Sequence, residues 1–184
     1  MKKFNSPMQL ETSRLILRQW KPSDLKPFAH LNTDPEVMLY FPSTLSTQQS
    51  DLLAEKFQDL ISCYGWGMWA VELKENQQFI GFVGLADQPE KFSFSPCVEI
   101  GWRLDRHYWN KGYATEAAQA CLKFAFEQLT LEQIVAFTAV SNQASEKVMQ
   151  RLGMHYVCLF KHPALDRQHV LAEHVLYRIV NPHL

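Results

Sequence analysis

The stretch YWNKGYATEAAQACLKFAFEQL, residues 108–129, constrains the fold more than any other part of the chain. Its small and apolar residues recur at helical spacing, at Ala114, Ala117, Ala118, Cys121, Leu122, Ala125 and Phe126. Such a stripe predicts an amphipathic helix whose inner face packs against a core. A strand is expected to end at Leu104 before this helix, and QIVAFTAV after it is predicted to be a buried strand. The turn at Gly112 therefore joins a strand to a helix.

The remaining pattern predicts one α+β domain. Alternating apolar residues predict further strands over residues 13–20, 67–74, 78–86, 96–104, 154–160 and 169–180. Helices are expected near Ser23 as an N-cap, at Asp34-Pro35, over 47–64, and over 142–153 with Asn142 as N-cap. The sequence has no linker or repeat, so we predict a single domain over 1–184, with residues 1–9 as a loosely ordered tail. Its expected core is a mixed sheet flanked by helices.

Composition argues against several classes of function. The net charge is −1 and no basic block occurs, so we expect no direct nucleic-acid binding. No apolar run approaches membrane-spanning length, and the N-terminal lysines precede no apolar stretch, so we expect no membrane association and no signal peptide. The cysteines Cys63, Cys97, Cys121 and Cys158 lie far apart and predict reduced thiols in a cytoplasmic protein, with two disulfides left open.

The residues of the turn before the long helix predict an anion-binding site. The first amides of a helix lack internal partners and carry the positive end of the helix dipole. Gly112 removes a side chain there, Ala114 and Thr115 keep the first turn small, and Lys111 adds a cation. These features favour a phosphate or pyrophosphate; the alternative is a plain loop with a glycine bend. GWGMWA, residues 65–70, matches a dinucleotide fingerprint, but it follows a helix and precedes a strand, the reverse of the required order.

The segment VEIGWRLDRHYWNKGYATEA resembles the acetyl-CoA-binding segment of the GNAT N-acetyltransferases. More narrowly, it resembles the branch with the RimJ/RimL-type ribosomal-protein N-terminal acetyltransferases. LETSRLILRQW, DPEVMLYF, NQASEKVMQRLGM and HVLYRIV fit that branch in order and spacing. The resemblance covers nearly the whole chain. It implies a GNAT-like domain with a mostly antiparallel sheet, an acyltransferase activity, and acetyl-CoA as cosubstrate.

The resemblance also assigns residues to the cofactor. The family's pyrophosphate loop, Q/R-x-x-G-x-G/A, falls on Trp109, Asn110, Lys111, Gly112, Tyr113 and Ala114, with Thr115 next in the first turn. Trp109 departs from the pattern, although tryptophan is similar to what this branch often carries. The strand end at Trp102, Arg103 and Leu104 would pair its backbone with the pantetheine arm, and Asn142 would hold the cofactor from the next helix.

Acetyl transfer to an amine needs a base, because a free alkyl amine has a pKa near ~10. Glu99 is the candidate base, with a charged residue on an exposed strand face as the alternative. The tyrosine acid of many GNAT enzymes is absent, since its position holds Met149. By resemblance Ser145 would protonate the thiolate; alternatively it only hydrogen-bonds its own helix turn. A backbone amide near Ile100 or Gly101 is expected to stabilise the oxyanion.

The acceptor is the least defined part of the prediction. Tyr40, Phe41, Trp66, Trp69 and His162 are candidates for lining its pocket, with packing as the alternative for each aromatic residue. His162, His169 and His174 lack metal-ligand spacing, so no metal is expected. The first choice of acceptor is a protein N-terminus. The alternatives are a small amine, such as an amino sugar, polyamine or amino acid, or a CoA-binding module with little turnover. The protein is expected to be a monomer or a homodimer.

Overall fold

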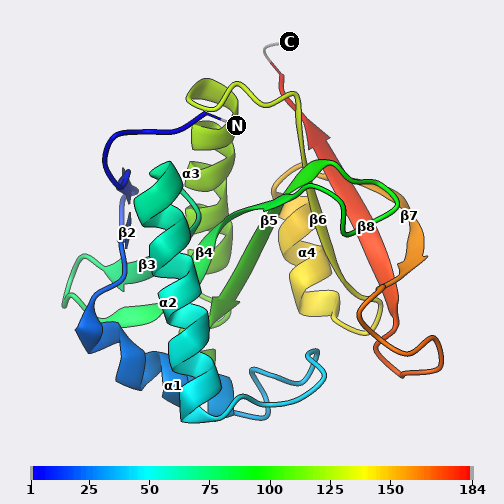
Figure 1. Ribbon diagram of the computed structural model, residues 1–184, viewed down its shortest axis with the longest axis horizontal. Coiled ribbons are helices and arrows are strands. Elements are labelled where there is room, and N and C mark those ends of the chain that lie inside the picture. The colour runs from blue at the N-terminus through cyan, green and yellow to red at the C-terminus, as the bar shows by residue number, and fades with distance from the viewer. Residues whose placement is uncertain (1, 183–184) are drawn as a thin grey trace.

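The computed structural model describes residues 2–182 and contains an eight-stranded sheet with four α-helices (Figure 1). The strands are β1 (Leu10–Glu11), β2 (Leu15–Arg18), β3 (Met68–Leu73), β4 (Phe79–Gln88), β5 (Cys97–Leu104), β6 (Gln133–Ala139), β7 (His155–Lys161) and β8 (Glu173–Val180). The helices are α1 (Leu25–Thr33), α2 (Thr47–Tyr64), α3 (Tyr113–Glu127) and α4 (Gln143–Arg151), with short 3-10 turns η1 (Pro22–Asp24) and η2 (Arg106–Tyr108). The predicted α+β class with a mixed, mostly antiparallel sheet is confirmed.

The sheet is interrupted between β5 and β6. Its order is β1-β2-β3-β4-β5-β6-β8-β7, and every neighbouring pair is antiparallel except β5 and β6. The register of this parallel pair consists of one residue pair, Glu99 with Val135, whereas β4 and β5 are paired over eight positions. Beyond Glu99 the two strands part, so the following stretch of β5 has a free edge on the β6 side.

The two faces of the sheet carry different helices. On β3, Trp69 packs edge-on against Phe124 of α3, while the neighbouring Met68 lies on the opposite face with Gly84 and Gly101 in its row. Phe82 of β4 shares the Met68 face and contacts Phe28 of α1 and Phe57 of α2. Figure 1 shows α1 and α2 in front of the sheet and α3 and α4 behind it.

Two predicted helix starts differ from the structure. Ser23 lies inside η1, and Asp24 rather than Ser23 precedes α1. Asp24 is buried against the guanidinium of Arg18, so its position is set by an ion pair. The residues after Asp34 form turns and no helix. Ser46 caps α2 through a reciprocal capping box with Gln49, one residue before the predicted start.

Residues 2–9 were expected to form a loosely ordered tail, and the structure instead packs them against the end of α2. The amides of Phe4 and Met8 donate to the carbonyls of Tyr64 and Gly65, at 3.0 and 2.7 Å. The indoles of Trp66 and Trp69 donate back to the carbonyls of Lys2 and Met8. Sequence patterns carry no signal for this because the segment has no regular secondary structure, and its backbone groups bond to residues about sixty positions away.

The four cysteines are free thiols in the structure. Cys121 is buried in the inner face of α3, and burial raises the pKa of its thiol. Over residues 2–182, no helix combines the length and apolar character needed to cross a bilayer.

Candidate active site

The face of β5 that points toward α1 and α2 carries Glu99, Gly101 and Arg103. Side chains alternate along a strand, and Val98, Ile100 and Leu104 on the other face are buried. The Asp105 amide donates to the Ile80 carbonyl on β4. By alternation, the backbone groups of residues 103, 101 and 99 also turn toward β4. Those of residue 100 turn toward Val135 of β6, and those of residues 102 and 104 turn toward the opening beyond it.

Glu99 lies where β5 and β6 part. Its Oε2 accepts a hydrogen bond from the side-chain amide of Gln88, at 2.8 Å. Burial raises the pKa of the Glu99 carboxyl to about 7, although the Gln88 hydrogen bond and the positive charge of Lys91 lower it. A carboxyl group with this pKa changes protonation state near neutral pH, as a general base requires. The sequence prediction singled out a carboxyl with these properties, although it did not foresee Gln88 as its partner.

The three residues expected to face the pantetheine arm differ in orientation. Trp102 turns its backbone groups toward the opening. The backbone groups of Arg103, which pairs with Phe82, turn toward β4. The Leu104 carbonyl also turns toward the opening but accepts a hydrogen bond from the Trp109 indole, at 2.8 Å. This bond gives the departure at Trp109 a physical reason, because the indole holds the turn against the end of β5.

The turn before α3 has a left-handed backbone at its glycine. Gly112 is the N-cap, with φ +82°, and Asn110 also has a positive φ, of +60°. Among the described residues no side chain caps this helix start, and the Gly112 carbonyl accepts the Glu116 amide. Unpartnered first-turn amides are available to an anion.

The charges beside this turn are arranged by the N-terminal strands. Glu116 accepts hydrogen bonds from Thr12, Ser13 and Arg14, and together these lower the pKa of its carboxyl. Arg14 also donates to the Lys111 carbonyl at 3.0 Å and lies 4.5 Å above the Tyr113 ring. The acidic residue in the first turn is thus neutralised, and the Lys111 and Arg14 cations lie on either side of Gly112.

Asn142 and Ser145 meet at the start of α4. The Asn142 side chain accepts the Ser145 amide at 3.1 Å and donates to the Thr138 hydroxyl at 3.0 Å, so it is the N-cap that the sequence predicted. Ser145 is half-buried, and within residues 2–182 its hydroxyl forms no hydrogen bond with another side chain or carbonyl. The alternative reading, in which the hydroxyl bonds its own turn, is not what the structure shows.

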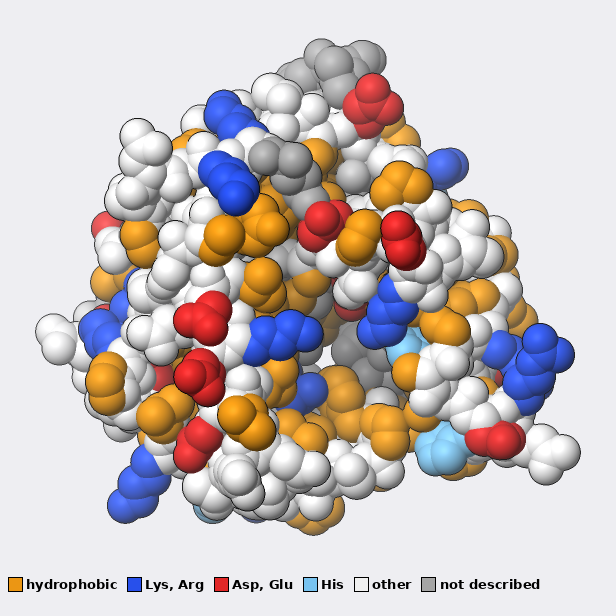
Figure 2. Space-filling view, in the orientation of Figure 1, with side chains coloured by type: hydrophobic (Ala, Val, Ile, Leu, Met, Phe, Trp, Pro, Cys, Tyr) orange, Lys and Arg blue, Asp and Glu red, His pale blue; other side chains and the backbone are white. Residues whose placement is uncertain are grey.

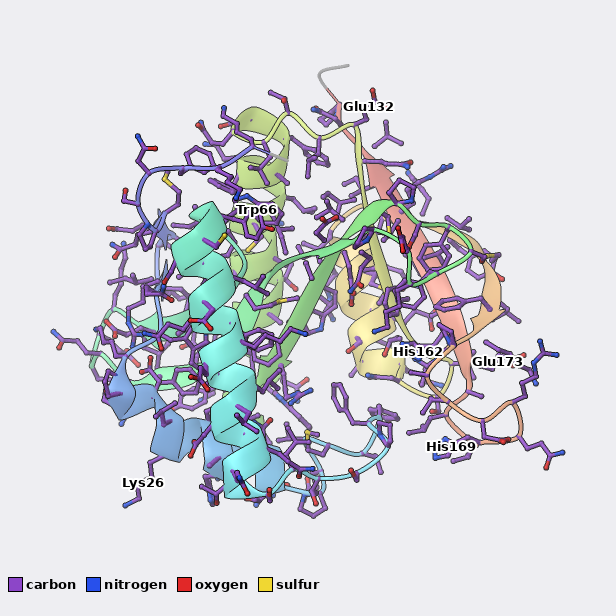
Figure 3. All side chains as sticks on the ribbon, in the orientation of Figure 1. Lys26, Trp66, Glu132, His162, His169 and Glu173 are labelled. Atoms are coloured by element: carbon purple, nitrogen blue, oxygen red, sulfur yellow. The ribbon has the colours of Figure 1, made fainter. Side chains whose placement is uncertain are left out.

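An aromatic cluster, formed by Phe92, Phe94, Phe137, Phe160, His162 and His174, covers the same face of β6, β7 and β8. Burial, followed by the charges of His174 and Lys91, lowers the pKa of His162 to about 4, so this imidazole is neutral. Figure 2 shows this face hollowed between the half bearing α2 and the half bearing the β7–β8 hairpin. Figure 3 shows His162 on the inner side of the hairpin, with His169 further out.

Four of the five predicted acceptor-pocket residues fall into two groups, and Tyr40, which is half-buried, belongs to neither. Trp66 and Trp69 are buried beneath the N-terminal segment, so they belong to packing and were wrong as pocket residues. Phe41 lies 4.0 Å from the Arg103 guanidinium, and His162 belongs to the aromatic cluster. Phe92 and Phe94 escaped notice because they lie in an irregular loop, where no periodicity identifies a facing partner.

Metal ligation finds no support in the described region, where no three His, Cys, Asp or Glu side chains come together as a metal site. The chain does match a family model described as an acetyltransferase (GNAT) domain, over residues 14–155. The chain belongs to the GNAT acetyltransferase family. It is therefore an acyltransferase of a family that uses acetyl-CoA, as the sequence predicted.

Individual relatives agree with this placement. The uncharacterized N-acetyltransferase YnaD of Bacillus subtilis is 30% identical over 154 residues, covering 84% of this chain and 86% of YnaD. A GNAT-family acetyltransferase structure from Bacillus anthracis aligns with a TM-score of 0.79 at 26% identity, covering 95% and 99% of the two chains. Mycobacterium smegmatis RimJ, solved with a CoA disulfide, aligns with a TM-score of 0.78 at 17% identity over 100% and 92%, which shows a shared fold.

Proposed function

We propose that this GNAT protein transfers the acetyl group of acetyl-CoA to a primary amine by direct attack, with Glu99 as general base. The observation that carries the proposal is the Glu99 carboxyl, whose pKa of about 7 is set where β5 and β6 part. A protein N-terminus is our first choice of acceptor, and a small amine is the alternative. An α-amino group has a pKa of ~7.7–8.0, within reach of such a base, whereas an alkyl amine near ~10.4 is harder to deprotonate.

In the proposed mechanism the neutral amine nitrogen attacks the thioester carbonyl and forms the new C–N bond. Glu99 accepts the proton that the nitrogen loses. The tetrahedral oxyanion then collapses, the C–S bond breaks, and the Ser145 hydroxyl donates its proton to the departing thiolate. Water returns a proton to Ser145, and Glu99 releases its proton to solvent, so both residues are restored.

Residue 101 turns its amide toward β4, and the Glu99–Val135 bridge engages the Ile100 amide, so the first amide of β5 that faces the opening is that of Trp102. We take this amide, one residue beyond the expected pair, as the candidate oxyanion donor.

The proposed cofactor path uses groups that the fold leaves without partners. The free edge of β5 at Trp102 presents backbone groups to the pantetheine amides, and the first turn of α3 presents amides to the pyrophosphate. That turn begins with Tyr113, Ala114 and Thr115, and it is preceded by Asn110 and Lys111. Asn142 would contact the cofactor from α4 while it also caps the helix.

The decisive assay measures CoA-thiol release from acetyl-CoA with a panel of acceptors: Ser-, Ala- and Thr-starting peptides, polyamines, aminoglycosides and free amino acids. Turnover with the peptides and none with the small amines is the expected result. Turnover restricted to a small amine would move the protein to the alternative acceptor class. Acetyl-CoA binding without turnover anywhere would overturn the catalytic proposal and leave a CoA-binding module.

A Gly112→Ala substitution should weaken acetyl-CoA binding about tenfold. Alanine in the left-handed conformation is strained by roughly 1–2 kcal/mol. Its Cβ would also lie 3.4 Å from Nη2 of Arg14, beside the amides proposed to bind the pyrophosphate. Isothermal titration with acetyl-CoA measures the change. Gly153→Ala is the matched control, because Gly153 also has a positive φ, of +77°, yet a Cβ there meets nothing within 4 Å. Equal losses in the two variants would show that backbone strain alone is responsible.

A Ser145→Ala substitution should lower kcat about tenfold and leave KM for acetyl-CoA unchanged. The expected loss of kcat is below the ~10²–10⁴-fold that a general acid or base commonly contributes. The reason is that a thiol has a pKa near ~8.5, so its thiolate can leave without full protonation. Steady-state kinetics with the best acceptor from the panel measures it. Ser145→Thr retains a hydroxyl and should retain most activity. Full activity in the alanine variant would remove Ser145 from the mechanism.

A further inference from the structure

Arg103 is a partly buried cation, and no carboxylate pairs with it in the part of the chain that the structure describes. Its Nη1 donates to Oδ1 of Asn32 at 2.6 Å, and its guanidinium lies 4.0 Å from the Phe41 ring and 5.4 Å from the Phe82 ring. Over residues 2–182, its Nε is the one buried side-chain nitrogen or oxygen with no hydrogen-bond partner. Burial lowers the pKa of the guanidinium to about 10, and it remains charged at neutral pH.

Arg18, which is buried, shows how an arginine with a structural role is paired in this fold. Arg18 donates to both oxygens of Asp24 and to Glu72, with distances between 2.7 and 2.9 Å. Arg14 and Arg106, near the surface, also pair with carboxylates. Among these arginines Arg103 alone lacks a carboxylate, and a buried unpaired charge is costly to retain.

The partners of Arg103 hold its guanidinium in place. Asn32 is itself fully buried, and its amide nitrogen donates to Ser50, which directs its oxygen toward Arg103. Nη1 is occupied by Asn32, and Nε is shut off from solvent without a partner. Nε and Nη2 together form the fork that binds a carboxylate through two parallel hydrogen bonds, so a carboxylate bound this way must displace a group that covers Nε. Phe41, which is 37% exposed, lies against the guanidinium and is the covering group nearest to solvent.

Arg103 also lies on the same face of β5 as Glu99. Four residues of strand separate the two positions by about 13 Å. The Glu99 Oε1 atom lies 3.8 Å from the point that a Gly101 Cβ would occupy, so this carboxyl leans toward Arg103. The amine of a bound molecule would lie roughly 3 Å from the Glu99 carboxyl, and its carboxylate roughly 3 Å from the Arg103 guanidinium. The amine and the carboxylate of that molecule would then be about 4–7 Å apart. In a free α-amino acid the amine and carboxylate share one carbon and are closer than this.

We propose that Arg103 binds a carboxylate of the acceptor, so that the preferred acceptors carry an acidic group about one residue away from the reacting amine. This inference rests on the proposed function, because it places the amine at Glu99. It names the acceptor more narrowly: a peptide or protein N-terminus with an acidic side chain next to the terminal residue.

The test compares two amidated peptides, Ser-Glu-Ala-Ala-amide and Ser-Gln-Ala-Ala-amide, which differ in a single charge. Their binding to the protein saturated with CoA is measured by titration calorimetry, a readout that needs no turnover. The glutamate peptide should bind at least about tenfold more tightly to the wild-type protein, and this ratio should fall close to one in Arg103→Met. Arg103→Lys should recover only part of it, because an ammonium has no fork.

Stability separates a binding role from a structural one. If Arg103 serves the acceptor, Arg103→Met should unfold close to the wild-type temperature, since removal of the unpaired charge offsets the hydrogen bond that the buried Asn32 oxygen loses. Equal binding of the two peptides by the wild type, or no binding of either, would overturn the proposal. Acetylation of both peptides at equal rates would overturn it while leaving the acetyltransferase function intact. Selective binding of the glutamate peptide without acetylation would support the Arg103 site and contradict the proposed transfer.

Discussion

A Glu99→Gln variant should lose between about 10² and 10⁴ of kcat while binding acetyl-CoA with unchanged affinity. The amide is nearly the same size as the carboxyl and keeps the contact with Gln88, but it accepts no proton. Steady-state CoA release and acetyl-CoA titration measure the two quantities separately. A variant with more than half of the wild-type kcat would place the base elsewhere.

The same carboxyl should shape the pH profile of the wild-type enzyme. A base must be deprotonated to act, so kcat should rise as the pH rises through about 7, where the Glu99 carboxyl loses its proton. Gln88→Leu is the matched control. The Gln88 hydrogen bond lowers the Glu99 pKa, so its removal should move the midpoint to higher pH and leave the high-pH plateau in place. A midpoint that does not move would assign the titration to another group.

Substitution of Arg18 should produce the largest loss of stability. In Arg18→Met the buried carboxylate of Asp24 loses its partner, and Glu72 keeps only Lys21. Removal of one side of a buried ion pair costs about 3–5 kcal/mol in the free energy of unfolding. Urea denaturation at pH 7 measures this. Arg14→Met is the control, since the half-exposed pair of Arg14 with Glu116 should contribute less than about 1 kcal/mol.

The Arg18 loss should also depend on pH. In the wild type, Arg18 and Lys21 lower the pKa of Glu72 below its ordinary value of 4.5, against the effect of burial. The stability from this pairing is therefore present above pH 4.5 and is lost as the pH falls through the lower, folded-state pKa. The difference between wild type and Arg18→Met should shrink in the same range. A difference that stays constant down to pH 3 would mean that lost packing, and not charge, is its cause.

Sequence periodicity predicted most of the fold, because most elements follow a simple alternation of apolar residues. The α3 stripe, the α4 N-cap at Asn142 and the turn at Gly112 are where they were expected, and the left-handed conformation of Gly112 is a finding of the structure. The cap of α1 was wrong because Asp24 is placed by Arg18, a tertiary contact that no local pattern records. Periodicity also gave no signal for residues 2–9, whose contacts are made by backbone groups in irregular conformations.

The candidate site was predicted in part. Glu99 and the α3 turn carry recognisable residue types at recognisable spacing, so their geometry followed from the pattern. The role of Arg103 was not visible, because an arginine on a strand gives no sign of whether a carboxylate will meet it. The missing partner emerges only when Asn32, Phe41 and Phe82 are brought around it by three different parts of the chain. Side-chain surroundings of this kind depend on tertiary structure.

The position of β8 between β6 and β7 has a consequence for synthesis of the protein on the ribosome. Strand β6 shares seven residue pairs with β8 and a single one with β5, and β7 also pairs with β8. The strands β1 to β5 can pair with their neighbours as soon as each emerges. By contrast, β6 and β7 are made earlier than the strand that joins them. They must therefore wait, with their edges unpaired, until residue 180 has left the exit tunnel.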